Sequence, residues 1–225
     1  MTDDAPARHL LYFADPMCSW CWGFSPAVQR LRSDLAETLP LRLIMGGLQP
    51  GNTETMTPRA KDEVRDHWEH VRDASGQPFD FAFFERDGFV YDTEPACRAV
   101  VTVRRLDGAK ALAMLDATHH AFYAENRDVT DKAELTAIAE TLGIDAAAFS
   151  NAFEDVETVT ETQGDFWLSQ ASGVTGFPTL LAVENGKAQI VTIGYRPWDA
   201  FGDALQAWAA TPIPAPDSPA PPGPA

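Results

Sequence analysis

Hydrophobic and polar positions divide the chain into three sections, and the first of these alternates strand and helix. An apolar run at 9–14 predicts a short buried strand, and residues 22–39 repeat apolar positions at helical spacing. A second apolar run at 41–45 predicts another buried strand, which ends at Gly46-Gly47. A strand, a helix and a strand in this order imply two neighbouring parallel strands joined by a right-handed crossover.

The second section, from about residue 57 to about residue 172, carries mostly helical patterns. Thr57-Pro58 starts a helix that runs to about Asp73, and Thr93 is the expected N-cap of a helix that continues through Glu94-Pro95. The aromatic run at 79–84 is expected to pack as a loop or turn. Further helices are expected over 108–124, 131–142 and 145–153, with a last one ending near Gly173.

Strand patterns return in the third section. A strand at 179–183 is followed by Asn185-Gly186, which favours a type I′ hairpin, and by a strand at 188–193. Pro197 then opens a final helix that runs to about Ala209. Residues 211–225 contain seven prolines, so we expect a disordered or extended tail there.

Charge and composition narrow the class of protein. The net charge is −16, from 17 Lys and Arg against 33 Asp and Glu, which argues against a nucleic-acid groove and against binding to an anionic membrane surface. No run of about 18 apolar residues is present to span a membrane. Residues 1–9 are acidic and lack the basic and apolar regions of a signal peptide, so we expect a cytoplasmic protein.

Two of the three cysteines form a C-x-x-C motif, Cys18-Ser19-Trp20-Cys21, between the first strand and the first helix. At a helix N-terminus, unpaired N–H groups and the helix dipole favour an anion, which would stabilise the thiolate of Cys18. Cys21 lies one turn further on and should be less exposed. We therefore expect Cys18 to attack as the nucleophile and Cys21 to resolve the mixed disulfide, with Trp20 contacting substrate.

Other interpretations of the cysteines stay open. The pair could form half of a zinc site or two inert core thiols, but no second C-x-x-C supplies the remaining zinc ligands, and we expect no metal. Cys97 lies on the apolar stripe of its helix and is expected to be a buried core cysteine rather than a third redox thiol.

Several polar residues also allow more than one role. Asp15 could shuttle a proton near Cys21, or it could only form a turn with the proline that follows. Glu63, His67 and His70 share a helix face that we expect to be solvated rather than to bind a metal. The pair His119-His120 is equally ambiguous.

A second motif lies at 173–179, where Gly176-Phe177-Pro178 directly precedes an apolar strand. Together, the motifs resemble those of the DsbA-like branch of the thioredoxin superfamily, in particular its FrnE-like disulfide oxidoreductases. The segments that carry the resemblance run in family order and lie at 15–24, 46–51, 94–99, 121–125 and 173–179.

This resemblance implies an α/β, thioredoxin-like fold with a helical domain inserted after the second strand. It implies catalytic residues at Cys18 and Cys21 and a cis proline at Pro178 that faces them, so that the backbone of Phe177 and Pro178 itself contact substrate. The expected domains are an N-terminal arm at 1–8, thioredoxin-like parts at 9–53 and 173–210, an inserted helical domain at 54–172 and a tail at 211–225.

The expected function is thiol–disulfide exchange with protein or small-molecule thiols. It needs no cofactor beyond a redox-active Cys18–Cys21 disulfide, but it needs a thiol-redox recycling partner, and glutathione is a candidate co-substrate. One alternative is a glutathione-dependent enzyme, similar to kappa-class transferases or 2-hydroxychromene-2-carboxylate isomerases, which typically carry a serine where Cys18 stands. Another is a redox-sensitive, chaperone-like module that binds peptides. The direction of electron flow stays open.

Overall fold

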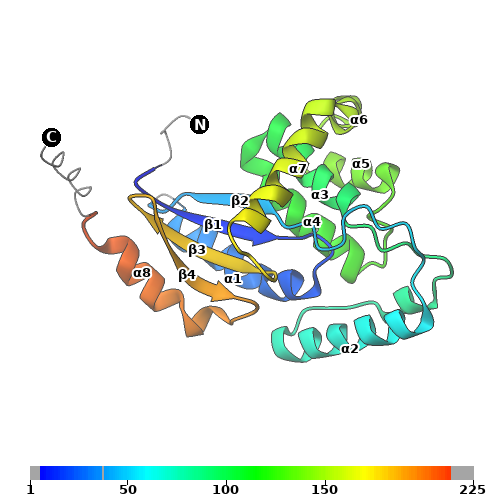
Figure 1. Cartoon of the computed structure of the whole chain (residues 1–225), viewed down its shortest axis with the longest axis horizontal. Helices are drawn as coiled ribbons and strands as arrows, with labels where there is room; N and C mark the ends of the chain where they lie inside the picture. The colour runs from blue at the N-terminus through cyan, green and yellow to red at the C-terminus, as the bar shows by residue number, and fades with distance from the viewer. Residues whose placement is uncertain (1–5, 37, 214–225) are drawn as a thin grey trace, which may run out of the picture.

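The computed structural model describes residues 6–36 and 38–213 and contains a mixed four-stranded sheet with helices around it (Figure 1). The sheet order is β2-β1-β3-β4. The strands are β1 (Arg8–Ala14), β2 (Leu41–Met45), β3 (Thr179–Glu184) and β4 (Lys187–Ile193). The helices are α1 (Ser19–Leu35), α2 (Pro58–Ser75), α3 (Glu94–Leu106), α4 (Ala111–Tyr123), α5 (Lys132–Thr141), α6 (Ala146–Glu154), α7 (Val156–Ala171) and α8 (Gly202–Ala210).

Strand pairing confirms the expected order of elements. β1 and β2 are parallel, with Leu10 opposite Leu41, whereas β3 is antiparallel to both β1 and β4. Asn185 and Gly186 both have positive φ, 49° and 77°, as a type I′ turn requires. The α/β, thioredoxin-like fold with helices inserted between β2 and β3 is therefore confirmed. The proposed domain boundaries stay a prediction, and the tail from residue 214 onward and residues 1–5 lie outside the described residues.

Two helix boundaries differ from the sequence prediction. The helix expected at 22–39 is α1, which begins at Ser19 because Cys18 already takes the N-cap position, and which ends at Leu35. Leu39 lies outside the helix but is fully buried, and its N–H donates to the carbonyl of Leu35 at 2.8 Å. Burial of a side chain at helical spacing therefore did not require a helical backbone at that residue.

The helix expected at 197–209 is interrupted. A short 3₁₀ turn at Trp198–Ala200 comes first, Phe201 is non-helical with φ −147° and ψ −16°, and α8 begins at Gly202. The indole of Trp198 fills the space beside Gly202, where a Cβ atom would lie 2.3 Å from the ring. Close packing of this indole requires the break, and no local sequence pattern announces it.

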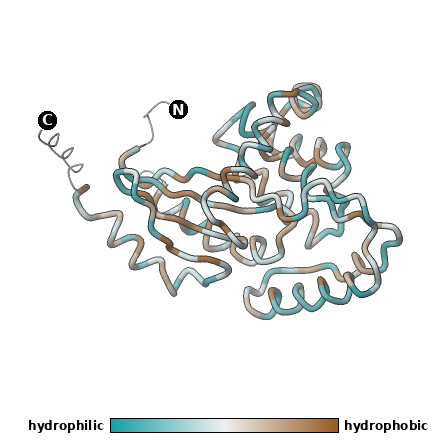
Figure 2. Tube along the Cα trace, viewed as in Figure 1, coloured by the Kyte–Doolittle hydropathy of each residue, from teal (hydrophilic) through white to brown (hydrophobic). Residues whose placement is uncertain are grey.

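Aromatic side chains pack α2 against other elements of the segment between β2 and β3. Trp68 of α2 is fully buried, and its ring centroid lies 4.8–6.1 Å from six other rings. The aromatic run expected to form a loop or turn contains a 3₁₀ turn at Phe81–Glu85, and its phenylalanines supply four of these rings. The residues of α2 are mostly hydrophilic, whereas the strands of the sheet contain more hydrophobic residues (Figure 2).

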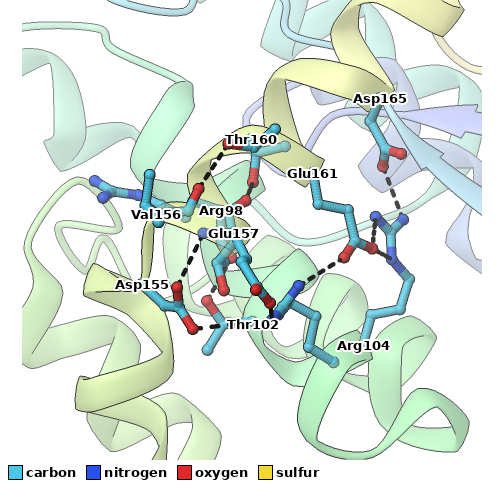
Figure 3. Close-up of polar contacts among 12 residues, drawn as sticks. Arg98, Thr102, Arg104, Asp155, Val156, Glu157, Thr160, Glu161 and Asp165 are labelled. Atoms are coloured by element: carbon cyan, nitrogen blue, oxygen red, sulfur yellow. Dashed lines mark hydrogen bonds and ion pairs between the residues drawn. The ribbon is translucent and has the colours of Figure 1, made fainter.

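An arginine network fixes α7 to α3 and to the edge of the sheet (Figure 3). Arg104 of α3 contacts Glu161 at 2.7 Å and Asp165 at 2.8 Å, both on α7, and also donates to the carbonyl of Leu43 in β2. Asp165 accepts the N–H of Met45 at 2.9 Å. Because α7 leads directly into the loop at 173–178, these contacts also fix where that loop begins. No helix of the described chain is both long and apolar enough to cross a membrane.

Candidate active site

The two cysteines of the C-x-x-C motif lie at the start of α1, at the end of β1. Cys18 is the N-cap residue, and the N–H of Cys21 donates to its carbonyl at 2.9 Å. Cys18 is 7% exposed and Cys21 is fully buried, as the sequence predicted. Both thiols are free. Cys18 is therefore the thiol that a substrate can approach, and Cys21 lies behind it.

Burial has a large effect on the pKa of the Cys21 thiol. It raises the pKa of Cys21 well above the ordinary value, and the neighbouring Cys18 raises it further. Cys21 is therefore a protonated thiol at neutral pH. It must lose this proton before it can act as a nucleophile, since only the thiolate attacks a disulfide.

The loop before β3 faces Cys18. The Phe177–Pro178 peptide bond is cis, as the resemblance implied, and Pro178 is buried. The Sγ atom of Cys18 lies 3.5 Å from the carbonyl oxygen of Phe177. The Phe177 ring occupies the space beside Gly46, where a Cβ atom would lie 2.3 Å from it. The missing side chain at Gly46 therefore leaves room for a ring that lies 131 positions later in the chain.

Asp15 connects three segments beneath the cysteines. Its buried carboxylate accepts the N–H of Met17 at 2.9 Å and the N–H of Leu48 at 2.7 Å. The thiol of Cys97 donates to the same carboxylate at 3.3 Å. Burial raises the pKa of Asp15, and its charge contributes to the raised pKa of Cys21. Asp15 is therefore more than a turn residue, and Cys97 is a fully buried core cysteine, as expected.

Two further side chains hold the same loop, and the sequence analysis assigned neither of them this role. The hydroxyl of Tyr91 donates to the carbonyl of Met17 at 2.5 Å. His119 of α4 is buried, and its Nε2 lies 3.1 Å from the carbonyl oxygen of Asp15. Burial lowers the pKa of His119 to about 4, so the neutral ring donates its Nε2–H to this carbonyl. The pair His119-His120 was a weak sign in the sequence of a role near the site, and no sequence pattern indicated one for Tyr91.

An open pocket of about 590 Å³ lies beside Cys18. Trp20 and Phe177 line it, so both lie beside the exposed thiol, whereas Pro178 does not line it. The Trp20 ring also packs on Tyr195, with centroids 5.6 Å apart. On the opposite wall, Glu63 and His67 of α2 face the pocket, and His70 does not. Within the described residues, no three His, Cys, Asp or Glu side chains are grouped to hold a metal ion.

Comparison with known proteins identifies related structures. A candidate protein disulfide isomerase from Nitrosomonas europaea is 35% identical, with a TM-score of 0.83, and the match covers 89% of this chain and 97% of that one. The cytosolic disulfide reductase DsbM from Pseudomonas aeruginosa, solved with glutathione, is 27% identical with a TM-score of 0.70, covering 89% and 96%.

Among curated proteins, the ClpXP adapter protein SpxH of Bacillus subtilis is 26% identical over 170 residues. That match covers 75% of this chain and 56% of the relative, so this chain spans little more than half the relative's length. The model of the DSBA-like thioredoxin domain matches residues 9–206. Membership of the FrnE-like subgroup stays a prediction. Since the family model covers nearly the whole described chain and the cysteine pair faces a cis proline, the protein belongs to the family of DSBA-like thioredoxin domains.

Proposed function

We propose that this protein exchanges disulfides with thiol substrates through Cys18 and Cys21. The observation that carries the proposal is the position of the Cys18 thiol. Cys18 is the N-cap residue of α1 and lines the open pocket, and its Sγ atom lies 3.5 Å from the carbonyl oxygen of Phe177, the residue before cis Pro178. Family membership supports an activity of this general class.

In the reductive direction, the Cys18 thiolate attacks one sulfur of a substrate disulfide. A mixed disulfide forms, and the other substrate sulfur leaves as a thiolate that takes up a proton. Cys21 then loses its proton and attacks Sγ of Cys18, which releases the second substrate thiol and leaves a Cys18–Cys21 disulfide. The substrate gains two electrons and the protein loses two, so a recycling dithiol or two thiols must reduce the protein again. In the oxidative direction the same steps run in reverse.

The surroundings favour this division of roles. Cys18 stands at the N-cap of α1, where the helix dipole favours an anion, whereas Cys21 is buried within the helix. The carbonyl and N–H of Phe177 can pair with the backbone of an extended substrate, and Trp20 offers a flat apolar contact beside the thiol. Pro178 shapes this loop from beneath, because it is buried.

The deciding experiment is a redox titration of the whole chain in glutathione buffers, followed by thiol alkylation and mass analysis. We expect a reversible two-electron transition confined to Cys18 and Cys21. Cys21→Ser should accumulate mixed disulfides at Cys18, Cys18→Ser should abolish exchange, and Cys97→Ala is the matched control that keeps the transition. A chain without a reversible transition, or a Cys21→Ser variant that turns over normally, would contradict the proposal.

Glutathione is a candidate for the thiol that reduces the protein again after each exchange. The related DsbM was solved with glutathione and is described as cytosolic, which supports glutathione as recycling thiol and supports the expected cytoplasmic location. A transferase or isomerase that uses glutathione as cofactor would not need the nucleophilic thiol. Turnover of a glutathione conjugate that survives Cys18→Ser would favour this alternative.

A binding role without turnover has separate support, because the curated relatives are described as ClpXP adapter proteins. The double variant Cys18→Ser/Cys21→Ser separates the two roles. If this variant still suppresses aggregation of an unfolded protein as well as the natural chain does, the pocket acts as a peptide-binding module. If suppression is lost with the thiols, exchange is the function.

A further inference from the structure

We propose that the pocket beside Cys18 selects apolar, positively charged segments of protein substrates over small anionic thiols such as glutathione. This inference rests on the proposed exchange function and adds a substrate class to it. It commits to one occupant, an extended protein segment with basic side chains next to its reactive cysteine. The argument comes from the charges and apolar side chains that line the pocket.

The charged lining of the pocket is acidic. Glu54 and Glu63 contribute carboxylates, His67 is the neighbouring titratable group, and neither Lys nor Arg occurs among the described residues that line it. Arg59 binds Glu63 at 2.8 Å, but its side chain is 89% exposed and is not part of the lining. Glu54 is exposed and lines the pocket, and no ion pair involves it in the described part of the chain, so no neighbouring cation neutralises its charge.

Two cations of α2, Lys61 and Arg65, are held away from the pocket, whereas Arg59 pairs with Glu63. Lys61 donates to the carbonyls of Phe84 and Arg86, on the side of the aromatic segment. The guanidinium of Arg65 lies over the ring of Phe84, 4.6 Å from its centroid. The surface of α2 that lines the pocket therefore carries Glu63 and His67 but neither Lys61 nor Arg65.

The pocket also offers apolar surface. Leu48 is 42% exposed although it borders the site, and Met56 and Val64 are only partly buried at the opposite wall. Trp20 and Phe177 extend this surface to the reactive thiol. A segment that places apolar side chains on these residues loses water-exposed area at both partners, which favours binding.

Glutathione fits this lining poorly, because it carries two carboxylates and one ammonium group. Its net negative charge would approach two carboxylates in a chain whose net charge is −16. Exposed charge pairs contribute only a few tenths to about 1 kcal/mol each, which corresponds to about fivefold in rate at most for each pair. The preference should therefore be severalfold at low ionic strength and should shrink with added salt.

Matched probes test this directly. Two heptapeptides that differ only in the residues beside a single cysteine, lysine in one and glutamate in the other, are each linked through a disulfide to 2-thiopyridine. The glutathione adduct of 2-thiopyridine is the third probe, and the reduced whole chain is mixed with each probe in single-turnover experiments. We expect the lysine peptide to react severalfold faster than the glutamate peptide and the glutathione adduct.

Variants assign the preference to the pocket. Glu54→Gln/Glu63→Gln should bring the ratio of the two peptide rates close to one, and Glu54→Lys should favour the glutamate peptide. Glu69→Gln is the matched control, because Glu69 is an exposed carboxylate of α2 outside the lining, and it should leave the ratio unchanged. Circular dichroism of each variant checks that the fold is kept.

The outcomes separate this inference from the proposed function. Equal rates for all three probes, or a lysine preference that survives Glu54→Gln/Glu63→Gln, would overturn the charge selection and leave disulfide exchange intact. A faster reaction of the glutathione adduct would also overturn it. If no probe reacts with the reduced chain, the exchange function itself is wrong.

Discussion

The two parts of the molecule contribute different things to the site. The thioredoxin-like part supplies the thiol of Cys18 and the backbone of Phe177 beside it. The segment between β2 and β3 supplies the side chains of Tyr91, Cys97 and His119, which hold the loop that carries the thiol. The comparison teaches that the reactive groups come from local motifs, whereas their geometry depends on contacts from distant parts of the chain.

The side chains that hold the Cys18 loop do so through buried polar contacts, whose loss costs free energy. The carbonyls of Asp15 and Met17 both point into the protein, and each receives one side-chain donor. Leaving a buried acceptor without its donor costs about 1–3 kcal/mol. The inserted helices are therefore expected to fix the Cys18 loop and to lower its mobility, and each contact can be removed separately.

The largest effect is expected from acidification acting on His119. Burial lowers its pKa to about 4, whereas the unfolded chain binds a proton near 6.5. The stability that neutral His119 contributes is therefore present above pH 6.5 and is lost as the pH falls towards 4. Each tenfold difference in proton affinity is worth about 1.4 kcal/mol, so the loss is on the order of 3 kcal/mol.

Urea unfolding of the natural chain and of His119→Gln, at several pH values between 4 and 7.5, measures this contribution as a difference. The exposed neighbour gives the control variant, His120→Gln. Asp15 acts in the opposite direction, because burial raises its pKa and its contribution is lost as the pH rises. A difference curve that is flat between pH 6.5 and 4 would show that His119 is not held neutral.

Gly46→Ala should come next, because it disturbs the contact between the two cysteine-facing loops. The added Cβ would lie 2.3 Å from the Phe177 ring, so the ring must move, and the carbonyl of the same residue contacts Sγ of Cys18. Overpacking of this kind costs about 2–3 kcal/mol. We expect exchange through Cys18 to slow by about tenfold, which corresponds to a rise of about 1.4 kcal/mol in the activation free energy. Stopped-flow mixing with a disulfide probe measures this rate.

The control for this variant is Gly164→Ala, at a helical glycine of α7 with open space beside it. It should leave exchange unchanged and stabilise the chain by about 0.5–1 kcal/mol, because alanine favours a helix over glycine. If Gly46→Ala exchanges disulfides at the natural rate, the position of the Phe177 ring does not matter for the reaction.

Tyr91→Phe should have a smaller effect. It keeps the ring but removes the hydroxyl that donates to the carbonyl of Met17, for a loss of about 1–2 kcal/mol in the free energy of unfolding. Tyr195→Phe is the control, because that hydroxyl donates to the carbonyl of Ala74 at an exposed position. We expect Tyr91→Phe to change the rate of Cys18 alkylation, which Tyr195→Phe should not do. Equal alkylation rates in both variants would contradict the anchoring role.

Cys97→Ala should have the smallest effect, below about 1 kcal/mol in unfolding free energy, because it removes one weak thiol donor from Asp15. The redox titration should still count two electrons per chain. If the titration of this variant counts fewer than two electrons per chain, Cys97 takes part in the exchange.

Local patterns were sufficient to predict the sheet and the position of the cysteine pair. The apolar runs predicted all four strands, and Asn185-Gly186 predicted the turn, because positive φ at both positions suits these two residues. The C-x-x-C motif predicted the position of its cysteines at a helix start, and the resemblance added cis Pro178. These predictions held because a strand, a turn and a helix start are each encoded by residues close together in the sequence.

Only the tertiary structure decided the surroundings of the thiols. Thr93 is the N-cap residue of α3, as predicted, yet its hydroxyl makes no cap hydrogen bond and accepts the N–H of Gln49 instead. Asp15 meets Cys97 across 82 positions and His119 across 104. Contacts of this kind depend on which segments pack side by side, and no spacing along the chain records it. The sequence determined which groups can react, and the packing of the inserted helices decided how they are held.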